Sequence, residues 1–279
     1  MLNNPLVYAD PTGEFFILDS YLSGYIIGFF SEGGSLWERG INGSLEGKRS
    51  LENDAKITNG LLFTDPNKSP ANQIWEIISR VTWQAPQTLG GWLTAQWINI
   101  SGKVNWVDYK YGATVVQTRA NLTGVTQGPY IVGNETLEAD ANNPLFQHEY
   151  GHYIQSQSMG WAYYPRVGIP SANSDGNHDF HPVEQDANRR ALLYFNEHID
   201  EFYDVNMFDN KGWDFWRNPL NINGSYTRGQ IVDFKNPNHF TSLDKIIVRA
   251  KWYDHASWLF LPIGGPVWVG LINAGTYNR

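Results

Sequence analysis

The stretch NPLFQHEYGHYIQSQSMG, residues 143–160, predicts the helix on which the interpretation of this chain depends. Its first residue is a suitable N-cap, Pro144 suits the first helical position, and the final glycine is a suitable helix stop. Within this helix His148 and His152 are one turn apart, roughly 40° from each other around the axis. Both imidazoles can therefore reach one metal ion from a single helical face.

Glu149 lies beside this pair of histidines. Its carboxylate can take a proton from a water that the metal holds, while the two imidazoles hold the metal. A His-Glu-x-x-His match arises by chance about once in a hundred chains of this size and composition. Taken alone, the motif also fits two exposed helix histidines with a neighbouring glutamate, so a third ligand is needed.

A second predicted helix begins at Pro182, shortly after Asp179. Glu184 and Asn188 are paired one turn apart on this helix, and Glu184 is the predicted third ligand. A separate apolar stripe runs along the same helix and predicts that it packs against the core. The stripe consists of Val183, Ala187, Ala191, Tyr194, Phe195 and Ile199.

Other residues compete for the place of third ligand. His178 and His181 are both able to bind metal, but His181 immediately precedes Pro182 and is the better helix-boundary residue. Asp186 is not among these competitors; it is an alternative to Asn188 as a partner of the first histidine, but it is two residues from Glu184 and is expected to face away. Three protein ligands suffice, because a catalytic zinc site keeps one position for water.

The two histidines followed by Glu184 in a Glu-x-x-x-Asn context resemble the gluzincin metallopeptidases. The resemblance implies a peptidase in which His148, His152 and Glu184 hold Zn²⁺ and Glu149 is the catalytic base that later protonates the leaving amine. Asn188 then orients the first histidine; the family often has Asp there, but an amide oxygen also accepts an imidazole N–H.

The fold that this resemblance implies is zincin-like α+β, with the active-site helix and a second ligand helix beside a small, mainly antiparallel sheet. The further histidine of metzincins is absent, since Gln155 and Ser158 stand at positions of that longer motif. An oxyanion donor is also expected, and the downstream candidates are His239 and Tyr253, with Tyr226 and His255 as further possibilities. Either 113–118 or 129–132 is the predicted cleft edge that pairs with an extended peptide.

Two stretches of this sequence resemble parts of bacterial Rhs proteins. LNNPLVYADPTGE, residues 2–14, resembles the closing signature of the Rhs-repeat-associated core, and residues 138–195 resemble the HEYGHYxQ…EQDANRRA arrangement at the ends of many Rhs proteins. The resemblance implies the toxin or effector tip of a polymorphic-toxin polypeptide, enclosed by an Rhs shell, matched by a cognate immunity protein and delivered to a target cell. Residues 10–13 alone would equally fit an ordinary type I turn.

Composition limits the alternatives. The formal net charge is −8 with a pI near 5.3, which disfavours nucleic acid as a partner. Cysteine is absent, so any metal must be held by His, Asp or Glu. Residues 1–14 lack the basic and apolar regions of a secretory signal, so secretion is expected to follow another route.

The remaining pattern predicts an α+β protein with its strands before residue 135. Residues 15–30 suggest a helix or hairpin, and 32–59 suggest surface loops. A helix starts at Ser69-Pro70 with an apolar stripe at positions 74, 77, 78 and 81, and Pro86 breaks that pattern. Short strands are predicted at 104–109, 113–118 and 129–132. We divide the chain into the Rhs tail (1–14), a helical and β portion (15–140) and the metal-site portion (141–279), the last two forming one compact domain.

Two other functions stay open. One is a binding module in which the metal is only a structural clamp. The other is a membrane-disrupting toxin that uses the apolar stretches 21–30 and 258–274, of which the first is too short to span a bilayer and the second is marginal in length and broken by prolines.

Overall fold

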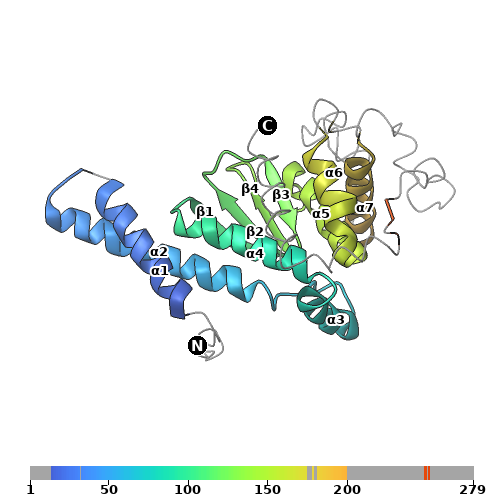
Figure 1. Cartoon of the computed structure of the whole chain (residues 1–279), viewed down its shortest axis with the longest axis horizontal. Coiled ribbons are helices and arrows are strands. Elements are labelled where there is room, and N and C mark those ends of the chain that lie inside the picture. The colour runs from blue at the N-terminus through green and yellow to red at the C-terminus, as the bar shows by residue number, and fades with distance from the viewer. Residues whose placement is uncertain are drawn as a thin grey trace.

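The computed structural model describes residues 14–31, 33–174, 178, 181–199, 248–249 and 251. Within them the chain forms seven α-helices and a four-stranded sheet, which confirms the predicted α+β class (Figure 1). The Rhs-like stretch 2–13, the apolar stretch 258–274 and the four candidate oxyanion donors lie outside the described residues.

Two long helices, α1 (Glu14–Ser31) and α2 (Leu36–Asn59), form an arm that extends away from the sheet (Figure 1). The prediction of surface loops over 32–59 is therefore wrong. Ser35 and Glu38 form a reciprocal capping box that starts α2. The glycines that suggested loops instead permit close packing, since a Cβ at Gly28 would lie 2.5 Å from a backbone oxygen of α2 and one at Gly43 would lie 2.7 Å from a backbone oxygen of α1.

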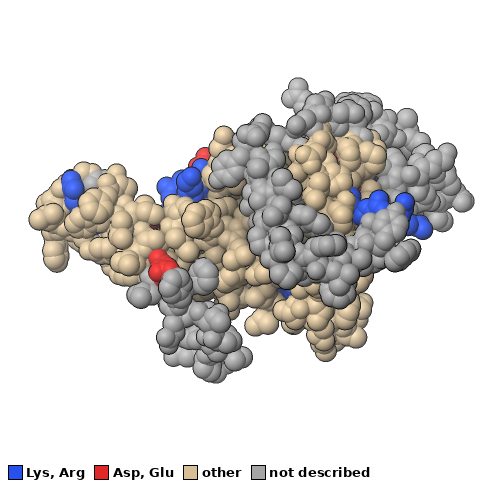
Figure 2. All heavy atoms as spheres, in the orientation of Figure 1, with Lys and Arg blue, Asp and Glu red and all other residues tan. Residues whose placement is uncertain are grey.

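The tip of this arm carries large apolar side chains that the rest of the described chain leaves uncovered. Phe30 is 71% exposed, Leu36 77% and Trp37 79%. Figure 2 shows few charged side chains over the arm on this face. Among the described residues, no helix has both the length and the apolar character needed to cross a bilayer.

Helices α3 (Pro70–Val81) and α4 (Ala85–Ile100) follow. Ser69 caps α3 as predicted, but Pro86 lies in the first turn of α4, where its fixed φ favours the helix start. The apolar stripe of α3 faces outward, with its residues at 74, 78 and 81 exposed. Its buried face is polar and consists of Glu76, Ser79 and Arg80.

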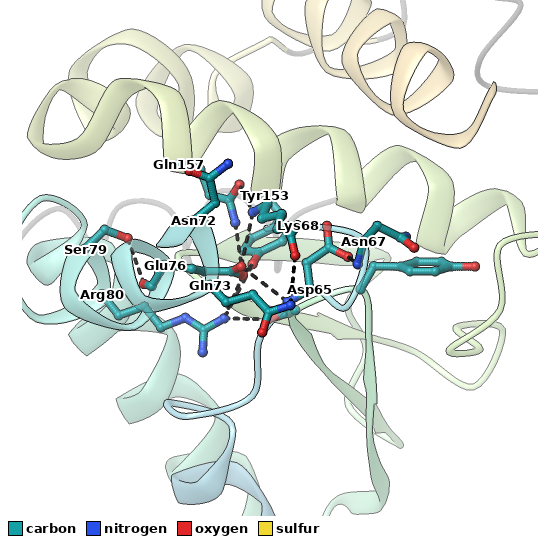
Figure 3. Close-up of polar contacts among 12 residues, drawn as sticks. Asp65, Asn67, Lys68, Asn72, Gln73, Glu76, Ser79, Arg80, Tyr153 and Gln157 are labelled. Carbon is teal, nitrogen blue, oxygen red and sulfur yellow. Dashed lines mark hydrogen bonds and ion pairs between the residues drawn. The ribbon is translucent and has the colours of Figure 1, made fainter. Parts of the chain in front are cut away.

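This inverted burial is explained by a polar network around Arg80 (Figure 3). The guanidinium donates to the carbonyls of Gly60 and Leu61, both at 2.9 Å, and to that of Gly112 at 2.7 Å. It also pairs with Glu76 at 3.0 Å, and Glu76 accepts a hydrogen bond from the Tyr153 hydroxyl. The network thus ties α3 to the turn at Gly112 and, through Tyr153, to the helix 144–159, which carries the two histidines.

The sheet contains β1 (Val104–Lys110), β2 (Ala113–Thr118), β3 (Gly124–Gln127) and β4 (Tyr130–Gly133) in the order β1-β2-β4-β3. Three strands were predicted and β3 was not. The β1–β2 and β3–β4 pairs are antiparallel, whereas β2 and β4 are parallel, so the sheet is mixed. The parallel pairing arises because a tight turn at Gly128, with φ of +59°, folds β4 back between β2 and β3.

Side chains that alternate along the strands build two cores. Val115 and Ile131 face the layer that contains α5 (Pro144–Met159) and α7 (Pro182–His198), and Val116 and Val132 face the layer that contains α2 and α4. The sheet is therefore covered on both faces, as Figure 1 shows. A 3₁₀ turn (Gly160–Ala162), a π-helical turn (Tyr164–Gly168) and the short α6 (Ile169–Ala172) lead from α5 (Pro144–Met159) towards α7 (Pro182–His198).

Candidate metal centre

Helix α5 begins and ends where the sequence predicts. The Asn143 side chain accepts a hydrogen bond from the Phe146 amide at 2.9 Å, and Pro144 occupies the first turn. At the other end Gly160 has φ of +53°, a left-handed value that ends the helix. His148, Glu149 and His152 are thereby fixed on one rigid helix.

Helix α7 also begins as predicted, with His181 as its N-cap. The His181 ring nitrogen accepts from the Val183 amide at 3.3 Å, so this histidine is occupied at the helix boundary. α5 and α7 cross at Gly151, where an added Cβ would overlap the carbonyl oxygen of Ala187. This glycine inside the His-Glu-x-x-His motif lets the two backbones approach closely enough for side chains on α7 to reach the histidines.

Imidazole nitrogens converge on a single carboxylate oxygen from α7. The Nε2 atom of His152 lies 2.9 Å from Glu184 Oε2, and that of His148 lies 3.2 Å from the same oxygen. His178 Nε2 lies 3.6 Å from it. The structure thus brings together the three predicted ligands, and it adds His178, which the sequence left as a competitor.

The far nitrogens of the two motif histidines are each held by an amide oxygen. His148 Nδ1 lies 3.0 Å from Asn188 Oδ1, the partner that the sequence proposed. His152 Nδ1 lies 2.8 Å from Oε1 of Gln155. Because an amide oxygen can only accept, both Nδ1 atoms carry a proton, so Nε2 is the nitrogen of each ring that would bind a metal ion after losing its own proton.

Gln155 connects His152 to the interior of α7. Its amide nitrogen donates to the Val183 carbonyl at 2.9 Å and to Asp186 at 2.8 Å, and Arg190 donates to the same Asp186 oxygen at 2.7 Å. Asp186 was expected to face away. It is fully buried, and its carboxylate accepts hydrogen bonds from Gln155 and Arg190, so its link to His152 runs through Gln155.

The carboxylate of Glu149 is held by the edge strand β3. Thr126 Oγ1 donates to Glu149 Oε2 at 2.7 Å, and the other carboxylate oxygen lies against Gly124, where a Cβ would overlap it. Glu149 is only 5% exposed, and its negative charge contributes to raising the pKa of both His148 and His152. β3 is an edge strand, whereas the two strands that were predicted to form the cleft edge, β2 and β4, are interior, so that prediction is wrong.

The electrostatics of the group favour cationic imidazoles beside an ionised carboxylate. Burial opposes a charge on His148, but the hydrogen bond and the charge of Glu184 outweigh it and raise the pKa of His148 to about 9. The same balance raises the pKa of His152. Burial also opposes the charge on Glu184, but the two imidazoles hold the pKa of its carboxyl well below the usual value. Positive charge is therefore stabilised at this point in the protein.

These residues fit a divalent metal ion. Glu184 Oε1 is buried and has no hydrogen-bond partner within the described part of the chain, which is a costly state for a carboxylate oxygen. The ligand atoms of His148, His178 and Glu184 all lie within 4.8 Å of one another, and His152 Nε2 contacts the same carboxylate. Imidazole nitrogen with carboxylate oxygen is a donor set that suits zinc.

Two parts of this centre were missed from the sequence. Gln155 is three residues after His152 on the same helix, so helical spacing alone could have suggested its contact. Thr126 lies on a short strand that was not predicted, and no local signal points to its contact with Glu149.

Comparison with known proteins adds nothing to this geometry. No family model, curated protein or solved structure matches the chain. The assignment of the site therefore depends on the arrangement of its residues.

Proposed function

We propose that the chain is a zinc-dependent metallopeptidase of the gluzincin type with a zincin-like fold, and that it acts as the toxin tip of an Rhs polypeptide. The observation that carries the proposal is the convergence of two α5 imidazoles on the Glu184 carboxylate of α7, with Glu149 next to them. The Rhs part of the proposal is supported by the two sequence resemblances.

In this proposal His148, His152 and Glu184 hold the ion. The chemistry that zinc supplies in such a site is polarisation of a carbonyl and a lower pKa for a water. Asn188 and Gln155 keep each imidazole in the tautomer that presents Nε2.

Glu149 is the proposed general base. Because Thr126 engages Oε2, Oε1 is the atom that takes the proton from water and returns it to the leaving amine. The protonation state of this carboxylate thus changes twice in each cycle while its position stays fixed by β3.

A peptide substrate is supported by the sheet. β3 is an edge strand that packs against α5, so an extended peptide that added to this edge would run beside Glu149. Main-chain hydrogen bonds to β3 would then place a scissile bond near the metal ligands.

Replacing Glu149 with Gln tests the proposal. We expect Glu149→Gln to bind zinc as the unaltered protein does and to lose hydrolysis of a broad peptide library by at least about a hundredfold. Glu138→Gln, which changes an exposed carboxylate ahead of α5, is the matched control and should retain full activity. If toxicity survived in Glu149→Gln, the metal would be a structural clamp and the chain a binding module. If peptide cleavage survived, Glu149 would not be the general base.

A second candidate function is supported by the exposed tip of the arm. Phe30, Leu36 and Trp37 would suit the interfacial region of a bilayer, where aromatic side chains are favoured. Dye release from liposomes in the presence of a chelator would support a membrane-disrupting role, and its absence would leave the peptidase proposal alone.

A further inference from the structure

We propose that His178 is a fourth and exchangeable metal ligand that closes the site in the resting protein. The proposal rests on the proposed metal site and adds a means of regulating it. His178 was a competitor for the third position in the sequence, but the structure places it beside Glu184 as an addition to the other ligands.

The ligand atoms of His148, His178 and Glu184 all lie within 4.8 Å of one another, and His152 Nε2 lies 2.9 Å from the Glu184 carboxylate. The His178 ring lies 6.1 Å from the His148 ring between centroids, and its Nε2 lies 3.6 Å from the carboxylate oxygen that both other histidines contact. Its Nδ1 lies 2.6 Å from Ser174 Oγ, a contact that leaves Nε2 directed at the cluster. With His178 as a fourth donor, three imidazole nitrogens and one carboxylate would fill the four positions of a zinc site and leave none for water.

His178 differs from the other three ligands in how firmly it is held. Its side chain is 35% exposed, whereas those of His148, His152 and Glu184 are 15%, 7% and 0% exposed. The other three also project from the long helices α5 and α7. His178 lies between α6 and α7 and contacts Glu184 at the longest distance of the three histidines. It is therefore the ligand that can leave at least cost.

The consequence is a site with two states. With His178 bound, no position is open to water, and the site has the closed form of a structural zinc centre. If His178 withdrew, its position would open to water, and Glu149 could then take a proton from that water. A substrate or partner that draws His178 away would thus switch the peptidase on.

The test compares His178→Ala with the unaltered protein by three measurements: zinc affinity in competition with a chelator, the visible spectrum of the cobalt-substituted protein, and peptide hydrolysis. We expect zinc affinity to fall roughly 10- to 100-fold, the cobalt bands to change as water replaces imidazole, and hydrolysis by the zinc-saturated variant to rise. His178→Gln, which keeps a polar side chain, should behave in the same way. His198→Ala, which removes an exposed histidine at the end of α7, is the matched control and should change none of them.

Unchanged affinity and an unchanged cobalt spectrum in His178→Ala would overturn the proposal. Weaker binding with slower hydrolysis would also overturn it, since His178 would then be a permanent ligand. His152→Ala separates this failure from failure of the metal site itself. If His152→Ala bound zinc as tightly as the unaltered protein, the proposed function would fail whatever His178→Ala showed.

Discussion

The crossing of α5 and α7 at Gly151 makes a prediction with a definite sign. A Cβ at this position would lie 2.9 Å from Ala187 Cα and would overlap the Ala187 carbonyl oxygen. The obstacle is backbone, which cannot turn aside as the end of a flexible side chain can. Gly151→Ala therefore forces α7 away from α5 and carries the Glu184 carboxylate away from the histidines.

Two effects of the substitution oppose each other. Alanine inside a helix is more stable than glycine by about 0.5–1 kcal/mol. Overpacking against a buried backbone costs about 1–3 kcal/mol, and it costs more where the neighbour cannot relax. The overlap is severe, so the steric cost wins and the free energy of unfolding should fall by about 1–2 kcal/mol. Zinc affinity should fall as well, because the Glu184 carboxylate, now 2.9 and 3.2 Å from the two imidazoles, would no longer lie where all three could hold one ion.

The assay is urea unfolding of the metal-free protein together with zinc titration against a chelator. Gly40→Ala in α2 is the matched control, since no atom lies within 4 Å of a Cβ built there. We expect the control to gain up to about 1 kcal/mol and to bind zinc normally. If Gly151→Ala were as stable as Gly40→Ala and bound zinc equally well, the close crossing of α5 and α7 would be refuted.

Three further predictions follow from other contacts of the site and the core. Thr126→Val should lower kcat about tenfold or more, with KM and zinc affinity unchanged, because Glu149 loses the hydroxyl that holds it. Thr126→Ser keeps that hydroxyl and should keep kcat close to that of the unaltered protein. A Thr126→Val enzyme with normal kcat would contradict this. The pKa of His148 is raised from 6.5 to about 9, so its charge stabilises the metal-free protein below pH 6.5 and that contribution is lost as the pH rises through 9. Relative to His148→Gln, the metal-free protein should lose about 3 kcal/mol over this range. Zinc affinity should rise about tenfold per pH unit for each imidazole proton that zinc displaces, and an affinity that did not change with pH would be inconsistent with a protonated site. Arg80→Met should cost about 3–5 kcal/mol in chemical denaturation, since it leaves a buried glutamate of α3 without its main partner, and a loss under 1 kcal/mol would show that the network of Figure 3 contributes little.

Local signals predicted the helices that carry the site. The N-cap at Asn143, the stop at Gly160 and the boundary at His181-Pro182 are where the structure has them. Helical spacing also predicted the contact between Asn188 and His148, because residues four apart on a helix lie on the same face, so Asn188 lies on the same face of α7 as Glu184. These features depend on a few neighbouring residues, which is why the sequence reveals them.

Features that depend on distant packing were not predicted. The glycines of α2 are needed because α1 packs closely against them. The buried face of α3 is polar because Arg80 donates hydrogen bonds to carbonyls of two loops that are distant in the sequence. β3 is only four residues long, so the contact between Thr126 and Glu149 had no sequence signal. Such contacts become visible only when the chain is folded.

The most direct test of the central claim is an anomalous difference map, recorded at the zinc edge, from crystals of the zinc-loaded protein. The account predicts one strong peak per chain, about 2.0–2.1 Å from Nε2 of both His148 and His152 and about 2.0–2.2 Å from the Glu184 carboxylate. A map without a peak between α5 and α7, or with the metal held by other residues, would contradict it.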